Sequence, residues 1–151
     1  MQYSSMFEQA IVILEKMGFS LKSIDPNDKL FTFKYADVNM FVGKGEEKND
    51  IDLFCSIHMT GTVEEQKQIL NDAQSMAEDD LKDFNTCYID DGLAYIALFL
   101  RIKESRHKLY KKHLMSMIDK LVEGYTTLMA AMCIISYSQS PEFIESLDNQ
   151  E

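Results

Sequence analysis

Tryptophan, proline and cysteine are scarce in this sequence, which has no Trp, two Pro and three Cys among 151 residues. A chain of this length buries about two-thirds of its unfolded surface, so it needs no metal ion or disulfide to fold. Three is also an odd number of cysteines, which disfavours a disulfide framework. We therefore expect one domain in a reduced, cytoplasmic setting, with Cys55, Cys87 and Cys133 as small buried apolar residues.

Long hydrophobic runs are absent as well. The most apolar stretches, 93–100 and 128–135, are far shorter than the roughly 20 residues that a helix needs to cross a bilayer. The first residues contain no basic segment ahead of their apolar stretch, as a secretion signal would. We predict a chain that neither spans a membrane nor binds one.

Motifs that carry chemistry are also missing. Cys55 and His58 lie three residues apart in a predicted strand, so they point to opposite faces and cannot hold one ion together. His107 and His113 lie six apart in a predicted helix and diverge around its axis. Residues 43–45 form only a G-x-G within a charged loop, without the rest of a phosphate-binding pattern. We therefore predict no catalytic residue, no metal site and no cofactor, which means that the protein is not an enzyme.

Positive charge is in short supply, and the formal net charge is −10. This balance disfavours generic binding to nucleic acid or to an anionic membrane, because like charges repel. The segment 101–113 is positively charged, unlike the chain as a whole, with six basic residues against the single Glu104. Such a basic strip either balances acidic neighbours, within the chain or in a second subunit, or binds an anionic partner. Its basic residues are Arg101, Lys103, Arg106, Lys108, Lys111 and Lys112.

The spacing of apolar residues separates predicted helices from predicted strands. Apolar residues recur at helical spacing from Met6 to Met17, ahead of a terminating Gly18, and Thr62 and Glu65 match a capping box at the start of a second helix. In chain order we expect a helix over 5–17, a short strand over 19–24, strands over 29–35, 38–42 and 50–59, a helix over 63–81, a hairpin over 85–102 that turns at Asp90-Asp91-Gly92, and a long helix from Ser105 towards Ser136.

This order of elements predicts the fold class. It is α-β-β-β(-β)-α-β-β-α, where the first strand is short, and its strands follow one another as hairpins. Such a pattern is typical of an α+β fold with a twisted, largely antiparallel sheet packed against helices. We expect residues 1–140 to form a single α+β domain and residues 141–151 to form an acidic, flexible tail.

Two predicted strands differ in the character of their faces. In 50–59 the apolar residues point one way and mostly polar residues the other, with Phe54 as the exception. In 93–102 both faces are apolar, whereas a strand with one wet face should alternate. We therefore expect protein to cover both faces of this strand. The candidates for a protein-binding or dimer surface are Phe54, Leu93, Tyr95, Ala97 and Phe99.

Three covers are possible for the second face of this strand: the long helix of the same chain, a second copy, or a bound segment of another protein. Since contiguous apolar patches are rarely left exposed on monomers, the sequence favours a non-catalytic protein-binding module that acts as a homodimer. One alternative is a small-ligand-binding protein or an enzyme of unidentified reaction, with His58 as a titratable group in its pocket. Another is a binder of anions or, less favoured, nucleic acid, through the strip 101–113.

The layout also resembles a known family. An N-terminal helix that ends in Met17-Gly18-Phe19, the strands "KLFTFKYADVNMFV" and "DIDLFCSIHM", a helix opened by "TVEE", a hairpin and a long final helix are similar to the type III secretion chaperone-like fold. That fold includes the YbjN-type bacterial proteins. The resemblance implies a non-enzymatic homodimer that binds a protein segment along apolar sheet and helix surfaces, in a chaperone-like or regulatory role. It carries over no catalytic residue.

Overall fold

The computed structural model describes residues 5–25, 27, 29–45, 50–101 and 108–138, with the side chains of 98–101 excepted. The predicted tail over 141–151 lies outside the described residues. So does the middle of the basic strip, including Lys103 and Arg106.

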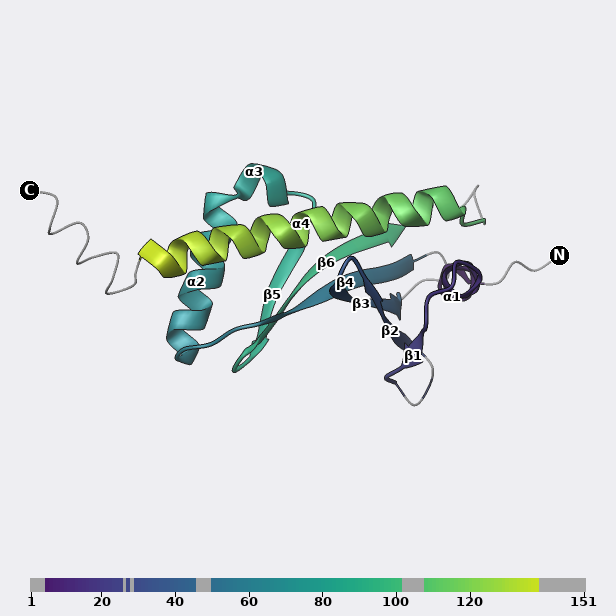
Figure 1. Cartoon of the computed structure of the whole chain (residues 1–151), viewed down its shortest axis with the longest axis horizontal. Coiled ribbons are helices and arrows are strands. Elements are labelled where there is room, and N and C mark those ends of the chain that lie inside the picture. Colours follow the sequence, from purple (N-terminus) through teal and green to yellow (C-terminus); the bar gives the residue numbers. More distant parts are fainter. Residues whose placement is uncertain (1–4, 26, 28, 46–49, 102–107, 139–151) are drawn as a thin grey trace, which may run out of the picture.

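Six strands form one antiparallel sheet in the order β1-β2-β3-β4-β6-β5. The long helix α4 runs the length of the molecule, with α1 near its start and α2 near its end (Figure 1). This arrangement confirms the predicted α+β fold and the predicted order of its elements, to which the structure adds the one-turn helix α3. The elements are α1 (Met6–Lys16), β1 (Lys22–Ser23), β2 (Leu30–Tyr35), β3 (Val38–Lys44), β4 (Asp50–His58), α2 (Val63–Met76), α3 (Glu78–Leu81), β5 (Asn85–Asp90), β6 (Leu93–Arg101) and α4 (Lys111–Ser138).

The helix predicted over 63–81 is divided into α2 and α3. Ala77 separates the two, because its φ of −110° and ψ of 29° are not helical. Glu78, Asp79 and Asp80 follow directly. Three carboxylates stabilise the positive N-terminal end of a new helix, whereas they would oppose the negative C-terminal end of a continuing one.

The long helix begins at Lys111, so the prediction that it starts at Ser105 is wrong: residues 108–110 are described and are not helical. Leu109 is buried, and its backbone N–H donates to Gln9 Oε1 at 2.7 Å. A contact with α1 therefore holds this segment in place of helical hydrogen bonds. The predicted continuation past Gly124 is confirmed, since α4 extends to Ser138. Even so, no helix within the described ranges combines the length and the apolarity that a bilayer span requires.

The core lies between the helices and one face of the sheet. Every second residue of β4 is buried, and the residues between them are not, which confirms the alternation predicted for 50–59. From the opposite side, α4 buries a stripe of apolar residues at helical spacing. The buried residues of β4 are Ile51, Leu53, Cys55 and Ile57, and those of α4 include Leu114, Ile118, Leu121 and Leu128.

Gln66 of α2, the one buried polar side chain in the described part of the chain, connects the helix layer to the β5–β6 turn. Its Nε2 donates to Gly61 O and to Asp91 Oδ1, both at 2.9 Å. Its Oε1 accepts from the Tyr88 hydroxyl at 2.9 Å and from the Gly92 N–H at 2.7 Å. All four hydrogen-bonding positions of the amide are used. Gln66 therefore fixes where the hairpin sits against α2.

We predict that Gln66→Leu destabilises the fold by about 3 kcal/mol, because it leaves several buried polar groups without a partner. Urea unfolding followed by circular dichroism measures this change. The control is Gln68→Leu in the same helix, where the side chain is exposed and hydrogen-bonds Asp72. That substitution should cost less than about 0.5 kcal/mol. Equal effects of the two substitutions would contradict the role assigned to Gln66.

A glycine in the middle of α4 accommodates an aromatic ring. A Cβ at Gly124 would lie 2.5 Å from the ring of Phe84, which precedes β5. Lys120 and Asp83 form an ion pair beside this contact, with Nζ and Oδ2 3.1 Å apart. Glycine weakens a helix by about 1 kcal/mol relative to alanine. Here it allows α4 to approach the start of β5 closely.

We predict that Gly124→Ala lowers the free energy of unfolding by about 1–3 kcal/mol, because the displaced ring costs more than the gain in helix propensity. Thermal unfolding gives the comparison. Thr126→Ala, at an exposed position of the same helix, should instead be neutral or stabilising. In a Phe84→Ala background the ring is absent, so Gly124→Ala should then stabilise. Stabilisation in the wild-type background would show that the contact is not tight.

Candidate functional site: the open face of the sheet

The second face of the sheet is not buried by the helices. The residues of β4 that point away from the core, Asp52, Phe54 and Ser56, are half-buried, and His58 is exposed. On the neighbouring strands Phe41, Leu93 and Tyr95 are half-buried too. In the part of the chain that the structure describes, no helix packs over this surface, which we call the open face.

Four of the five residues predicted as a protein-binding or dimer surface lie on this open face. Phe54 of β4 pairs with Ala97 of β6, and Leu93 and Tyr95 follow on the same side of β6. Ala97 is only 2% exposed, so its side chain forms part of the floor. The backbone of Phe99 pairs with Asp52, and its side chain lies outside the described residues.

Stacked aromatic rings cross the middle of the open face. The Phe41 and Phe54 rings are nearly parallel, with an interplanar angle of 5° and centroids 4.9 Å apart. The Phe54 and Tyr95 centroids are 5.8 Å apart at an angle of 54°. Sequence reasoning did not single out Phe41. Its position in β3, between the buried Met40 and Val42, was the available signal that it points outward.

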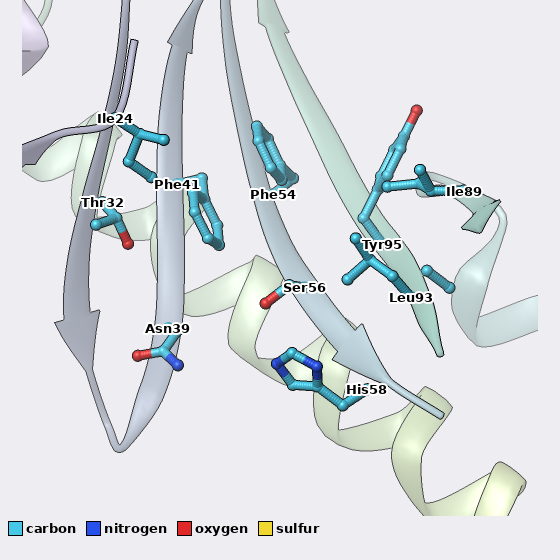
Figure 2. Close-up of a pocket in the computed structure, with 11 residues that line it drawn as sticks. Ile24, Thr32, Asn39, Phe41, Phe54, Ser56, His58, Ile89, Leu93 and Tyr95 are labelled. Atoms are coloured by element: carbon cyan, nitrogen blue, oxygen red, sulfur yellow. The ribbon is translucent and has the colours of Figure 1, made fainter. Parts of the chain in front are cut away.

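Two isoleucines extend the rings into a longer apolar row. Figure 2 shows Ile24 and Ile89 at either end of the line formed by Phe41, Phe54 and Tyr95. We call these five residues the apolar row. They line a hollow of about 530 Å³, and Ile24 and Ile89 are 47% and 52% exposed. Such exposure of large aliphatic side chains around a hollow is typical of a binding surface.

Polar side chains lie beside the apolar row and, at Thr32 opposite Phe41, within its line. Thr32, Asn39, Ser56 and His58 also line the hollow, and in Figure 2 the last three lie below the rings. The Thr32 hydroxyl donates to the backbone oxygen of Met40 at 2.9 Å, so it is already engaged. The hollow is therefore mainly apolar, with a narrow polar margin.

Two titratable groups, one on the open face and one on the core face of the sheet, have raised pKa values. The pKa of Tyr95 is raised, mainly by a hydrogen bond with Cys87 and to a smaller extent by burial. Its hydroxyl therefore stays neutral at physiological pH. Burial raises the pKa of Cys55 to about 12, and this thiol faces the core. Among the described residues, no three side chains of the metal-binding types are grouped closely enough to hold an ion. Cys55 and His58 point to opposite faces, as predicted.

The described part of the basic strip lies apart from this hollow. Lys108, Lys111 and Lys112 are exposed around the start of α4, and the neighbouring Leu109 contacts α1. The Lys108 ammonium lies 5.3 Å from the centre of the Tyr110 ring. Arg101 ends β6, where its backbone pairs with Asp50. The strip therefore adds no described side chain to the open face.

Comparison with known proteins supports the fold alone. No known protein family matches the sequence, and no curated protein matches it. A crystal structure of an uncharacterized protein from Methanothermobacter thermautotrophicus is similar, with a TM-score of 0.60 and 12% sequence identity over 83% of this chain and 94% of that chain. The resemblance to type III secretion chaperones stays a prediction.

Cysteine reactivity offers a test of the two faces. The prediction that all three cysteines are buried is wrong for Cys87 and Cys133, which are exposed, because one lies on the edge strand β5 and the other on the outer side of α4. At about pH 8 a maleimide should modify these two within minutes. Cys55 should react only in denaturant, because its thiol is buried and protonated. Intact mass counts the additions, and rapid modification of Cys55 in the native state would contradict this core assignment.

Proposed function

We propose that this protein is a non-catalytic protein-binding module, chaperone-like or regulatory, whose open face buries apolar side chains of a partner. The observation that carries the proposal is the apolar row, which extends across the sheet and is left partly exposed. Clustered aromatic side chains supply much of the energy in protein interfaces. Each 100 Å² of apolar surface removed from water contributes about 2.5 kcal/mol gross, less the cost of ordering the partner.

The charge of the chain supports a protein partner over nucleic acid. Aromatic side chains on an open sheet can stack on the bases of single-stranded RNA, and the rings of Phe41, Phe54 and Tyr95 would suit that use. Such proteins add a positively charged groove that follows the phosphates. This chain has a net charge of −10 instead, which repels a polyanion.

A second candidate is binding of a small apolar molecule. The hollow of about 530 Å³ is within the range of ligand sites, and a few polar groups border it. Ligand sites normally enclose most of the ligand, however, whereas the end residues of this row are about half exposed. The protein-binding proposal fits that exposure better.

Homodimer formation and a cytoplasmic location belong to the same proposal. We expect light scattering at micromolar concentration to give twice the chain mass of 17.4 kDa. If the open face forms the dimer, Phe54→Ser should shift the mass towards the monomer, because it removes the central ring of the apolar row. A wild-type monomer at all concentrations up to about 100 µM would contradict the homodimer.

Partner binding is tested by matched substitutions on the two faces. Ile89→Ser alters the apolar row, and Ile134→Ser makes the same change on α4, where Ile134 is 57% exposed. We expect a partner captured from native cell extract to be lost with Ile89→Ser and with Phe54→Ser, and to be kept with Ile134→Ser. Thermal unfolding checks that all variants fold. Equal capture by all variants would show that the open face is not the binding surface.

A further inference from the structure

The apolar row runs across the strands. Along β4, Phe54 is followed on the same face by Ser56 and His58. Apolar contact therefore ends after one residue in that direction. Across the sheet the row continues from Ile24 beyond β1 to Ile89 of β5 (Figure 2). An occupant that uses the whole row must lie across the strands.

The spacing of the three rings in the row is close to the rise of one α-helical turn. The ring centroids of Phe41, Phe54 and Tyr95 are 4.9 and 5.8 Å apart. A helix places side chains on one side about every 5.4 Å, once per turn. An extended chain places them every 6.6–6.8 Å, so it would lose register with the rings within a few residues.

Backbone hydrogen bonding also favours a helix. The backbone groups of β3, β4 and β6 are paired with each other within the sheet, so the face of the sheet offers none to an occupant. An extended segment that lies in the apolar hollow would bury unpaired N–H and C=O groups, which is costly. A helix satisfies these groups internally.

Shape argues against a second copy as the occupant of this face. The open face is hollowed by about 530 Å³. Two such hollows placed face to face would enclose empty space, and unfilled volume at an interface loses favourable contacts. A convex helix, about 10 Å in diameter, fits a hollow of this kind.

Charge indicates which helix fits. Asp52 precedes Phe54 on the open face, on the side of the apolar row opposite Ser56. Asp90 follows Ile89 at the end of the row and pairs with Leu93, on the His58 side. The chain as a whole carries −10. Basic side chains beside the apolar stripe of an occupant would be attracted by this overall negative charge. Uncharged polar side chains of the occupant would suit the positions near Asn39, Ser56 and His58.

We propose that the occupant of the open face is a cationic amphipathic helix of a partner protein, lying across the strands with its apolar stripe on the apolar row. This inference rests on the proposed function and names the partner's chemistry. The six strands of the sheet have five gaps of about 4.8 Å, so the row spans about 24 Å. That span corresponds to about 16 helical residues, or between four and five turns.

The probe is a 16-residue peptide of leucine and lysine with leucine at helical spacing and one central tryptophan. Tryptophan fluorescence reports its binding directly, because the protein has none. The control peptide has the same composition with leucine and lysine alternating, as in a strand. We expect the helical peptide to bind in the micromolar range at about 150 mM salt, and the alternating peptide to bind at least tenfold more weakly.

Three readouts place the peptide on the open face. Ile89→Ser should weaken binding about fivefold and Phe54→Ser at least tenfold, while Ile134→Ser leaves it unchanged. Bound peptide should slow maleimide modification of Cys87, which pairs with Tyr95 across β5 and β6. It should not slow modification of Cys133 on α4. Non-specific attraction to an acidic protein would affect all variants and both thiols equally, and would overturn the proposal.

Other outcomes separate this inference from the proposed function. Equal binding of the alternating peptide, with the same protection of Cys87, would contradict a helical occupant. It would still be consistent with an open face that binds protein. A wild-type dimer in which Cys87 is protected until Phe54→Ser is introduced would identify a second copy as the occupant and overturn the helix. The absence of binding by either peptide would also overturn the inference of a helical occupant. The proposed function itself fails only if Ile89→Ser and Phe54→Ser leave partner capture unchanged.

Discussion

The pairing of β4 with β6 is the constraint on which both faces of this protein depend. Nine residues of each strand are paired, from Asp50 opposite Arg101 to His58 opposite Leu93. Directly opposite residues share a face of the sheet. This one register therefore sends Leu53 to the helices and Phe54 to the open face. A slip of either strand by one residue would reverse the assignment of its whole set of side chains.

The two faces of the sheet differ in how completely their side chains are packed. On the helix side, buried polar atoms have hydrogen-bond partners and side chains pack closely. Gln66 uses all four of its hydrogen-bonding positions, and Gly124 makes room for the Phe84 ring. The open face shows no such closure, and its rings contact mainly each other. The core is completed by one face of the sheet, so the open face is not needed to close it.

Sequence reasoning found the part of the candidate site that breaks a pattern. Phe54 stands out in an otherwise polar series, and Tyr95 lies in a strand that is apolar on both sides. Phe41 was missed because it lies within the apolar run 40–42, where alternation with Met40 and Val42 was the available signal. Ile24 and Ile89 were missed because they lie at a strand end and in an irregular edge strand, where alternation gives no reliable face.

The sequence by itself determined the order of helices and strands, the α+β class and the inner face of β4, because each depends on local spacing of apolar residues. Only the tertiary structure decided which strands are neighbours, that α3 separates from α2, and that five residues from five separate segments form one row. Those features depend on contacts between distant parts of the chain. The packing energy of such contacts cannot be read from the local spacing of residues.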